Sequence, residues 1–202
     1  MEIQILDVDY IMIGERPVVR IVGKDKEGKT VCGFYEGYLP YFYAEGEVDK
    51  ILKDNPLVLK MEKVSKKLAV GYKGAVDLWK IIISHPGKTP ELRELLRSKG
   101  LRVYEADILF KYRFLADFGL NGYGWVNIEN SNGVSTNTVN VDKKVQILNI
   151  KPIQRDDNIK LKVMAFDIEC VPAQRGSVPE SSKDPVVLIS FVFGNDYKGK
   201  KT

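Results

Sequence analysis

Residues 161–170 read LKVMAFDIEC, an apolar stretch that carries two carboxylates, Asp167 and Glu169, at alternate positions. Its composition predicts a strand, in which alternate side chains share a face, so the two carboxylates should lie about 6–7 Å apart along it. Carboxylates in this arrangement bind hard divalent cations, and a pair of such cations can hydrolyse a phosphodiester bond. Solvated acids at an ordinary strand end have the same spacing, so the interpretation depends on the surrounding sequence.

A second strand is predicted close by. Ile159–Val171 and Val186–Phe193 are both strand-like and are separated by a polar segment, which favours a hairpin. The chain then ends in polar residues 195–202, where a turn would be expected. We therefore expect residues 159–202 to be the incomplete beginning of a second domain.

The first part of the chain predicts a β-rich α+β domain. Strand patterns cover residues 3–13, 17–22, 30–35, 39–43, 57–70, 76–84 and 101–108, and helices are expected at 48–53, 89–99 and 110–118. Thr89-Pro90-Glu91 has the signature of a helix start, with Thr89 as a hydroxyl N-cap, and Gly100 ends that helix. The segment from residue 57 to 108 is a β-β-α-β unit of ferredoxin-like or RNA-recognition-motif-like kind.

Three segments are expected along the chain. Residues 1–130 form the N-terminal domain, 131–158 a linker with a connecting strand at 144–153, and 159–202 the second domain. Residues 121–141 are rich in Asn, Gly, Ser and Thr, which favour turns over regular structure, so the boundary is placed there.

Composition limits the classes of protein that remain. Of 202 residues, 44% are hydrophobic and 29% charged, which is typical of a globular protein. The net charge of +4 is compatible with a polyanionic partner. Cys32 and Cys170 lie too far apart in sequence to suggest a metal cluster. Acidic residues near the start exclude a signal peptide, and no apolar run is long enough for a membrane span, so we expect a cytoplasmic protein with no membrane partner.

The context of the carboxylates resembles a known family. Residues 165–169, followed by Asp184-Pro185 and the strand after it, resemble the first exonuclease motif of family B DNA polymerases and its hairpin partner. Landmarks similar to the archaeal members occur in the expected order at 6–11, 17–20, 40–43, 79–80, 85–86 and 107–110. The resemblance spans nearly the whole chain, apart from 121–141. It implies an N-terminal domain followed by the first strands of an RNase-H-like 3′-5′ exonuclease domain.

The resemblance also implies which chemistry is incomplete. In the complete polymerase Asp167 and Glu169 would be catalytic residues and ligands of Mg²⁺ or Mn²⁺. The other exonuclease acids and the palm aspartates would lie beyond Thr202. This chain alone is therefore expected to be inactive, to require no cofactor, and to have as partners the remainder of the polymerase and single-stranded or primer-template DNA.

Archaeal family B polymerases carry a pocket in this domain that captures template-strand uracil. By resemblance its residues are Tyr10, Pro40, Tyr41, Pro86, Thr89, Ile108, Phe110 and Arg113. Apolar and aromatic walls suit an unstacked base, a tight wall would exclude the methyl group of thymine, and Arg113 is placed to meet a phosphate. Thr89 departs from the valine of the best-known members. For the aromatic positions, ordinary core packing is the alternative.

Two other functions are compatible with the sequence. One is a stand-alone single-stranded nucleic-acid-binding protein, with RNA as one possible target, built on the β-β-α-β unit, although the aromatic consensus of RNA-recognition motifs is absent. The other is a short assembly subunit of a split polymerase. A reading frame that continues past Thr202 would favour the polymerase fragment.

Overall fold

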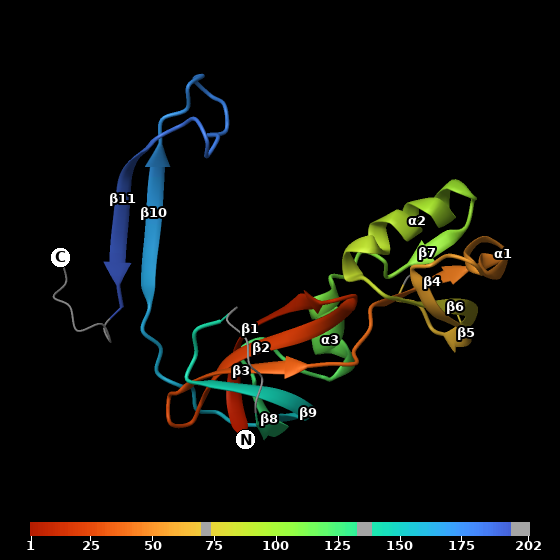
Figure 1. Ribbon diagram of the computed structural model, residues 1–202, viewed down its shortest axis with the longest axis horizontal. Helices are drawn as coiled ribbons and strands as arrows, with labels where there is room; N and C mark the ends of the chain where they lie inside the picture. Colours follow the sequence, from red (N-terminus) through yellow and green to blue (C-terminus); the bar gives the residue numbers. More distant parts are fainter. Residues whose placement is uncertain (70–73, 133–138, 195–202) are drawn as a thin grey trace. The chain divides into compact units, whose positions relative to one another are not determined.

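The computed structural model describes residues 1–69, 74–132 and 139–194, and it contains two compact units, Met1–Asp157 and Asn158–Thr202 (Figure 1). Val70, expected to end a strand, and the turn expected at 195–202 lie outside the described residues. No helix in the described part of the chain is long and apolar enough to cross a membrane.

A closed five-stranded barrel makes up one part of the first unit. Its order is β1-β2-β3-β9-β8, with a parallel pair between β3 and β9 and antiparallel pairs elsewhere. The strands are β1 (Glu2–Ile13), β2 (Arg16–Asp25), β3 (Thr30–Tyr35), β8 (Trp125–Asn132) and β9 (Lys143–Ile153). Gly14, with a φ of +59°, makes the tight turn between β1 and β2, as the sequence predicted. This topology resembles the five-stranded barrel of OB-folds.

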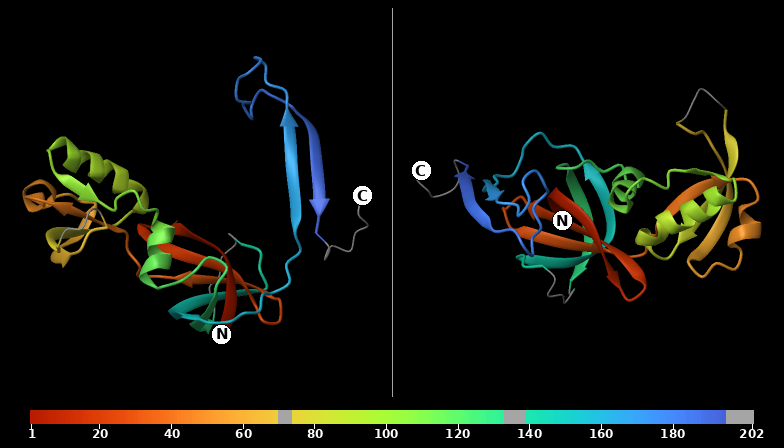
Figure 2. Two further views of the ribbon diagram at one scale, coloured as in Figure 1. Left: turned by 180° about the vertical axis from the view of Figure 1, so that it is seen from behind. Right: turned by 90° about the horizontal axis from the view of Figure 1, so that it is seen from above.

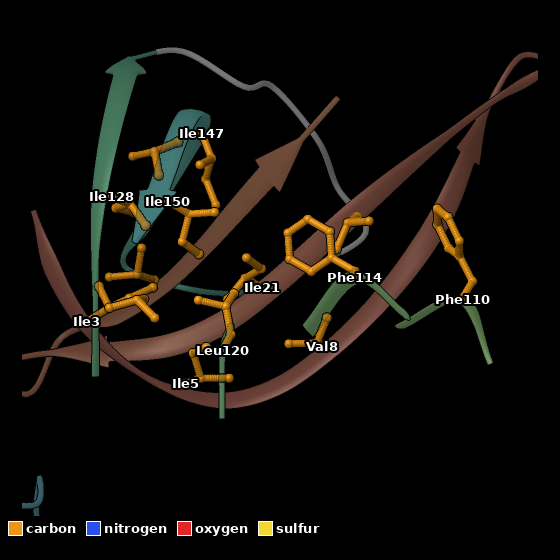
Figure 3. Packing of buried hydrophobic residues seen from close by; sticks show 14 residues of the cluster. Ile3, Ile5, Val8, Ile21, Phe110, Phe114, Leu120, Ile128, Ile147 and Ile150 are labelled. Atoms are coloured by element: carbon orange, nitrogen blue, oxygen red, sulfur yellow. The ribbon is translucent and has the colours of Figure 1, made fainter. Parts of the chain in front are cut away.

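The barrel core is built from alternating strand residues and one helix. Inward-facing side chains such as Ile3, Ile21 and Ile147 are almost completely buried. Helix α3 (Phe110–Asp117) adds Phe114 to this cluster, as Figure 3 shows. Gly33 is required because a Cβ there would come within 2.5 Å of Ile147 Cδ1 across the β3–β9 pair.

A four-stranded antiparallel sheet lies between β3 and β8 in the chain. Its order is β5-β6-β4-β7, and one face packs against α1 and α2 through apolar residues that include Phe42, Ile81 and Leu92 (Figure 2). The elements are β4 (Tyr41–Glu45), α1 (Val48–Leu52), β5 (Val58–Lys66), β6 (Val76–Ile83), a 3₁₀ helix η1 (Pro86–Lys88), α2 (Thr89–Ser98) and β7 (Arg102–Tyr104). The predicted β-β-α-β segment is therefore not a set of adjacent strands, because β4 lies between β6 and β7.

The structure corrects the interpretation of residues 121–158. β8 occupies part of the stretch expected to be irregular. β9 matches the connecting strand predicted at 144–153, and it pairs within the barrel of the first unit. The polar residues of β8 alternate with Val126 and Ile128, which are buried in the core. Backbone pairing to β1 and β9 thus overrides the weak strand propensity of Asn and Ser.

The helix start at Thr89 also differs from the prediction. Thr89 is not the N-cap of α2, because η1 runs directly into the helix and Lys88 occupies the cap position without a side-chain bond. The Thr89 hydroxyl instead donates to the Pro86 carbonyl oxygen at 2.9 Å. His85 caps η1, since its Nδ1 accepts from the Gly87 amide at 2.9 Å.

The second unit contains an antiparallel hairpin. β10 (Met164–Cys170) is shorter than the strand predicted over 159–171, and it pairs with β11 (Val186–Phe193), which has the predicted bounds. Asp184 organises the connection between them, because its carboxylate accepts hydrogen bonds from the amides of Ala173 and Glu180.

Candidate functional site

The structure brings all eight residues of the predicted pocket together. They line a single pocket of about 510 Å³ in the first unit, a volume within the range of small-molecule sites. The residues come from β1, the start of β4, η1 with the first turn of α2, and the segment that enters α3: Tyr10, Pro40, Tyr41, Pro86, Thr89, Ile108, Phe110 and Arg113. Residues far apart in the sequence are thus gathered at one concave surface.

Aromatic contacts fix the wall on the barrel side. Phe110 is buried and lies edge-to-face with Tyr10, with ring centroids 5.2 Å apart. Tyr38 stacks on the other side of this group, 5.3 Å from Phe110 and 5.1 Å from Phe114. Phe110 therefore belongs both to the pocket and to the barrel core, so the two alternatives considered for it coexist.

Arg113 is held inside the wall by Glu105. Its side chain is only 8% exposed, Nη1 lies 2.5 Å from Glu105 Oε2, and Nη2 donates to the Glu105 carbonyl oxygen at 2.9 Å. Lys66 binds the same carboxylate at 2.8 Å. Burial disfavours the charge of Glu105, but hydrogen bonds from Lys66 and Arg113 outweigh this and lower its pKa. Arg113 is thus committed to an internal ion pair, whereas the sequence suggested that it meets a phosphate.

One nitrogen of the Arg113 guanidinium is left without a partner. Its Nε is buried and has no hydrogen-bond partner in the described part of the chain. An unsatisfied buried donor costs about 1–3 kcal/mol, which the ion pair with Glu105 has to offset. The guanidinium also lies 4.7 Å from the centroid of the Tyr41 ring.

Backbone strain accompanies the ion pair. Glu105 has a φ of +57°, a left-handed conformation that is rare for residues other than glycine, asparagine and aspartate. The chain turns here from β7 into residues 106–110, which line the pocket. Since such strain persists only where the surroundings impose it, the Glu105 bonds set the course of this wall.

Tyr41 is anchored through its hydroxyl group. The hydroxyl donates to both oxygens of Asp117, at 2.9 and 2.8 Å, and the Tyr38 hydroxyl donates to the same carboxylate at 2.7 Å. Burial raises the pKa of both tyrosines, and the bonds to Asp117 raise it further. Both phenols are therefore neutral donors at physiological pH.

Charged residues surround the pocket. Asp9 is paired with Arg20, whose Nε donates to Asp9 Oδ1 at 2.7 Å. Arg93 and Lys111, both partly exposed, also line the pocket. These two cations are more accessible to an external phosphate than Arg113.

The predicted metal ligands lie on β10 in the second unit. Asp167 pairs with Ser190 of β11, Glu169 pairs with Leu188, and both carboxylates lie on one face of the strand. Both are exposed. Among the described residues no group of three or more His, Cys, Asp or Glu side chains is placed to hold a metal ion. Two carboxylates fit a divalent cation only as part of a larger oxygen set.

Comparison with known proteins places these features in a family. A family model described as DNA polymerase family B, exonuclease domain, matches residues 101–202. DNA polymerase 2 of Aeropyrum pernix is 32% identical over 209 residues, covering 95% of this chain and 25% of that protein. The DNA polymerase of Archaeoglobus fulgidus is 32% identical over 197 residues, covering 95% of this chain and 24% of that protein. The structure of the family B DNA polymerase from Pyrobaculum calidifontis matches with a TM-score of 0.75 and 27% identity, covering 96% of this chain and 25% of that one.

These relatives define a class of polymerases that carry an exonuclease domain. The chain belongs to DNA polymerase family B, as its resemblance at 165–169 predicted. It spans about a quarter of the length of the relatives named above.

Sequence reasoning missed two residues that hold the pocket, Glu105 and Asp117. Asp117 follows Arg113 by four residues on α3, so helical spacing alone would place both on one face. The role of Glu105 depends on its left-handed backbone and on Lys66, which is distant in sequence, and no local pattern indicates it.

Proposed function

We propose that the first unit binds single-stranded template DNA and recognises uracil in it through the pocket around Tyr41. The observation that carries this proposal is the convergence of the eight residues on one pocket. Its apolar and aromatic walls suit an unstacked base. Uracil would enter, whereas thymine would bring an extra methyl group against the wall.

Thr89 is compatible with this role. Its hydroxyl hydrogen is committed to the Pro86 carbonyl within the same turn, so it is not available to a ligand. The side chain then differs little in volume from the valine that occupies this position in the best-known relatives. The polar hydroxyl group of Thr89 thus has its hydrogen-bond partner within its own turn.

The test is fluorescence anisotropy of the full chain with two oligonucleotides that differ at one base, uracil or thymine, at fixed salt. We expect the uracil strand to bind about tenfold more tightly or better, since one methyl group in a tight pocket is typically worth that ratio. Equal affinities would overturn uracil recognition. Affinity for both strands should fall steeply with salt if phosphate contacts supply the general binding, and a flat response would overturn that part.

For the second unit we propose that Asp167 and Glu169 supply two ligands of a divalent-metal exonuclease site in the whole polymerase. Their placement on one face of β10, within the matched exonuclease region, supports this. The metal, Mg²⁺ or Mn²⁺, would activate water and stabilise the leaving oxygen. The chain by itself should not shorten labelled single-stranded DNA, and metal-dependent 3′-to-5′ shortening that is lost in Asp167→Ala would contradict this.

The four-stranded sheet with helices α1 and α2, residues 41–104, is called the sheet unit below. It supports a second candidate function, a general surface for single-stranded nucleic acid. We infer a ferredoxin-like unit from its β-α-β-β-α-β element order and its sheet order β5-β6-β4-β7. However, lysine ammonium groups lie over the rings that such a surface would use, with Lys66 over Tyr43 and Lys80 over Tyr41, both at 4.1 Å. Stacked bases would have to displace them. Equal affinity for RNA and DNA without uracil preference would favour this candidate.

A further inference from the structure

Helix α3 carries two functional faces. Phe114 turns toward the barrel core, whereas Phe110, Arg113 and Asp117, spaced at i, i+3 and i+7, lie on the side of the pocket and of Tyr41. Asp117 does not line the pocket, but it binds a residue that does. One helix thus supplies both the wall and a support behind the wall.

The Asp117 carboxylate is one of the places near the pocket where hydrogen bonds join helix α3 to the sheet, and the Arg113–Glu105 pair is another. It accepts from Tyr41, the first residue of β4, and from Tyr38, in the segment that leads from the barrel into the sheet. The Tyr41 ring also lies against Arg113 and Lys80, at 4.7 and 4.1 Å from the ring centroid. The hydroxyl bond fixes the far end of the ring, and the cations contact its face.

We propose that Asp117 is a positioning residue that sets base discrimination by holding Tyr41 at a fixed depth in the pocket wall. This inference rests on the proposed uracil pocket. Discrimination against one methyl group requires a wall that does not yield, because a ring that can tilt would admit thymine. Asp117 touches no ligand in this account, so its effect should appear in the ratio of uracil-strand to thymine-strand affinity and not in general DNA binding.

The experiment is a double-mutant cycle on the full chain, read out by anisotropy with the uracil and thymine oligonucleotides. Asp117→Ala and Tyr41→Phe should each reduce the uracil preference roughly three- to tenfold, the range expected for losing one hydrogen bond of this kind. The double variant should lose no more than Asp117→Ala alone, since that variant already lacks the bond that Tyr41→Phe removes. Asp117→Asn should recover part of the preference, because its amide oxygen can accept one hydroxyl.

Tyr112→Phe is the matched control. Tyr112 lies on the same helix and is 55% exposed, so removing its hydroxyl should leave the affinity ratio at the wild-type value. If Asp117→Ala keeps the full uracil preference, or if its effect adds to that of Tyr41→Phe, the positioning role is wrong while the uracil pocket stands. If the wild-type chain itself shows no preference, the pocket proposal fails, and the inference fails with it.

Discussion

The pocket and the acidic hairpin differ in how their functional side chains are supported. Around the pocket, Arg113 and Tyr41 are each held by a carboxylate from another part of the first unit. On the hairpin, Asp167 and Glu169 are exposed, and the Asp167 carboxylate accepts a local hydrogen bond from the amide of the next residue, Ile168. The difference indicates that the proposed base recognition can be organised within a single unit, whereas the proposed metal site needs more oxygen ligands than these two carboxylates supply.

The largest expected effect follows from removing a shared core residue. Phe114→Ala should lower the free energy of unfolding by about 3–5 kcal/mol, because Phe114 is fully buried in the barrel cluster. Phe191→Ala is the matched control, since Phe191 is 50% exposed on β11 and its loss should cost far less. Urea unfolding followed by far-ultraviolet circular dichroism measures both, because the signal comes from the backbone of both units. Equal costs would show that the two regions are supported alike.

Glu105→Gln should have the next largest effect. It weakens the partner of the buried Arg113 and should cost about 1–3 kcal/mol of stability. Asp167→Asn is the control on the hairpin and should be close to neutral. Thermal unfolding of the two variants at pH 7 would contradict this comparison if their melting temperatures were the same.

The Glu105 pair also predicts a pH dependence. Because the pKa of Glu105 is lower in the folded state, its contribution is present at neutral pH and is lost as pH falls below the usual pKa of a glutamate and through the lower folded-state pKa. Wild type should therefore lose stability on acidification more steeply than Glu105→Gln. Unfolding measured from pH 7 downward tests this, and parallel curves for the two proteins would exclude Glu105 as a contributor.

A smaller effect is expected from filling the pocket. Thr89→Gln should bring the affinities for uracil and thymine strands together, since the longer side chain occupies the pocket, with a change of about 1–3 kcal/mol in discrimination. Thr89→Val should retain the preference, because the hydroxyl group that it removes donates its hydrogen bond to the Pro86 carbonyl within the same turn. Anisotropy decides between them, and loss of preference in Thr89→Val would assign the hydroxyl a direct role.

The smallest effect concerns the hairpin carboxylates. Asp167→Asn combined with Glu169→Gln should change the stability of the chain by less than about 0.5 kcal/mol, as is usual for exposed positions. Mg²⁺ should raise the melting temperature of neither form measurably. A clear Mg²⁺-dependent shift in the wild type, absent in the double variant, would show that two carboxylates suffice for binding.

Local patterns predicted much of the secondary structure. The turn at Gly14, the strand at 186–193 and the helix ended by Gly100 depend on signals carried by a few neighbouring residues. The sequence did not predict β8, because its strand character comes from pairing with β1 and β9 and not from its own residues. The position of β4 between β6 and β7 is likewise a long-range property that alternation cannot reveal.

The candidate site shows the same limit. The eight wall residues were assigned by resemblance, and the residues alone left core packing as an equal alternative for the aromatic ones. The commitment of Arg113 to Glu105 could not be foreseen, because it depends on a left-handed residue and on burial. Sequence patterns indicate which groups a side chain can bind, and the fold determines which of those groups lies next to it.

The insertion of the sheet unit into the barrel has a consequence for folding. The first three barrel strands are complete when β3 ends at Tyr35, but the strands that close the barrel begin only at Trp125. The sheet unit is contiguous in sequence and can form from local contacts, whereas the barrel must bring together strands with a large sequence separation, which slows folding. During synthesis the outer edges of β1 and β3 therefore lack their barrel partners until β8 and β9 have been made.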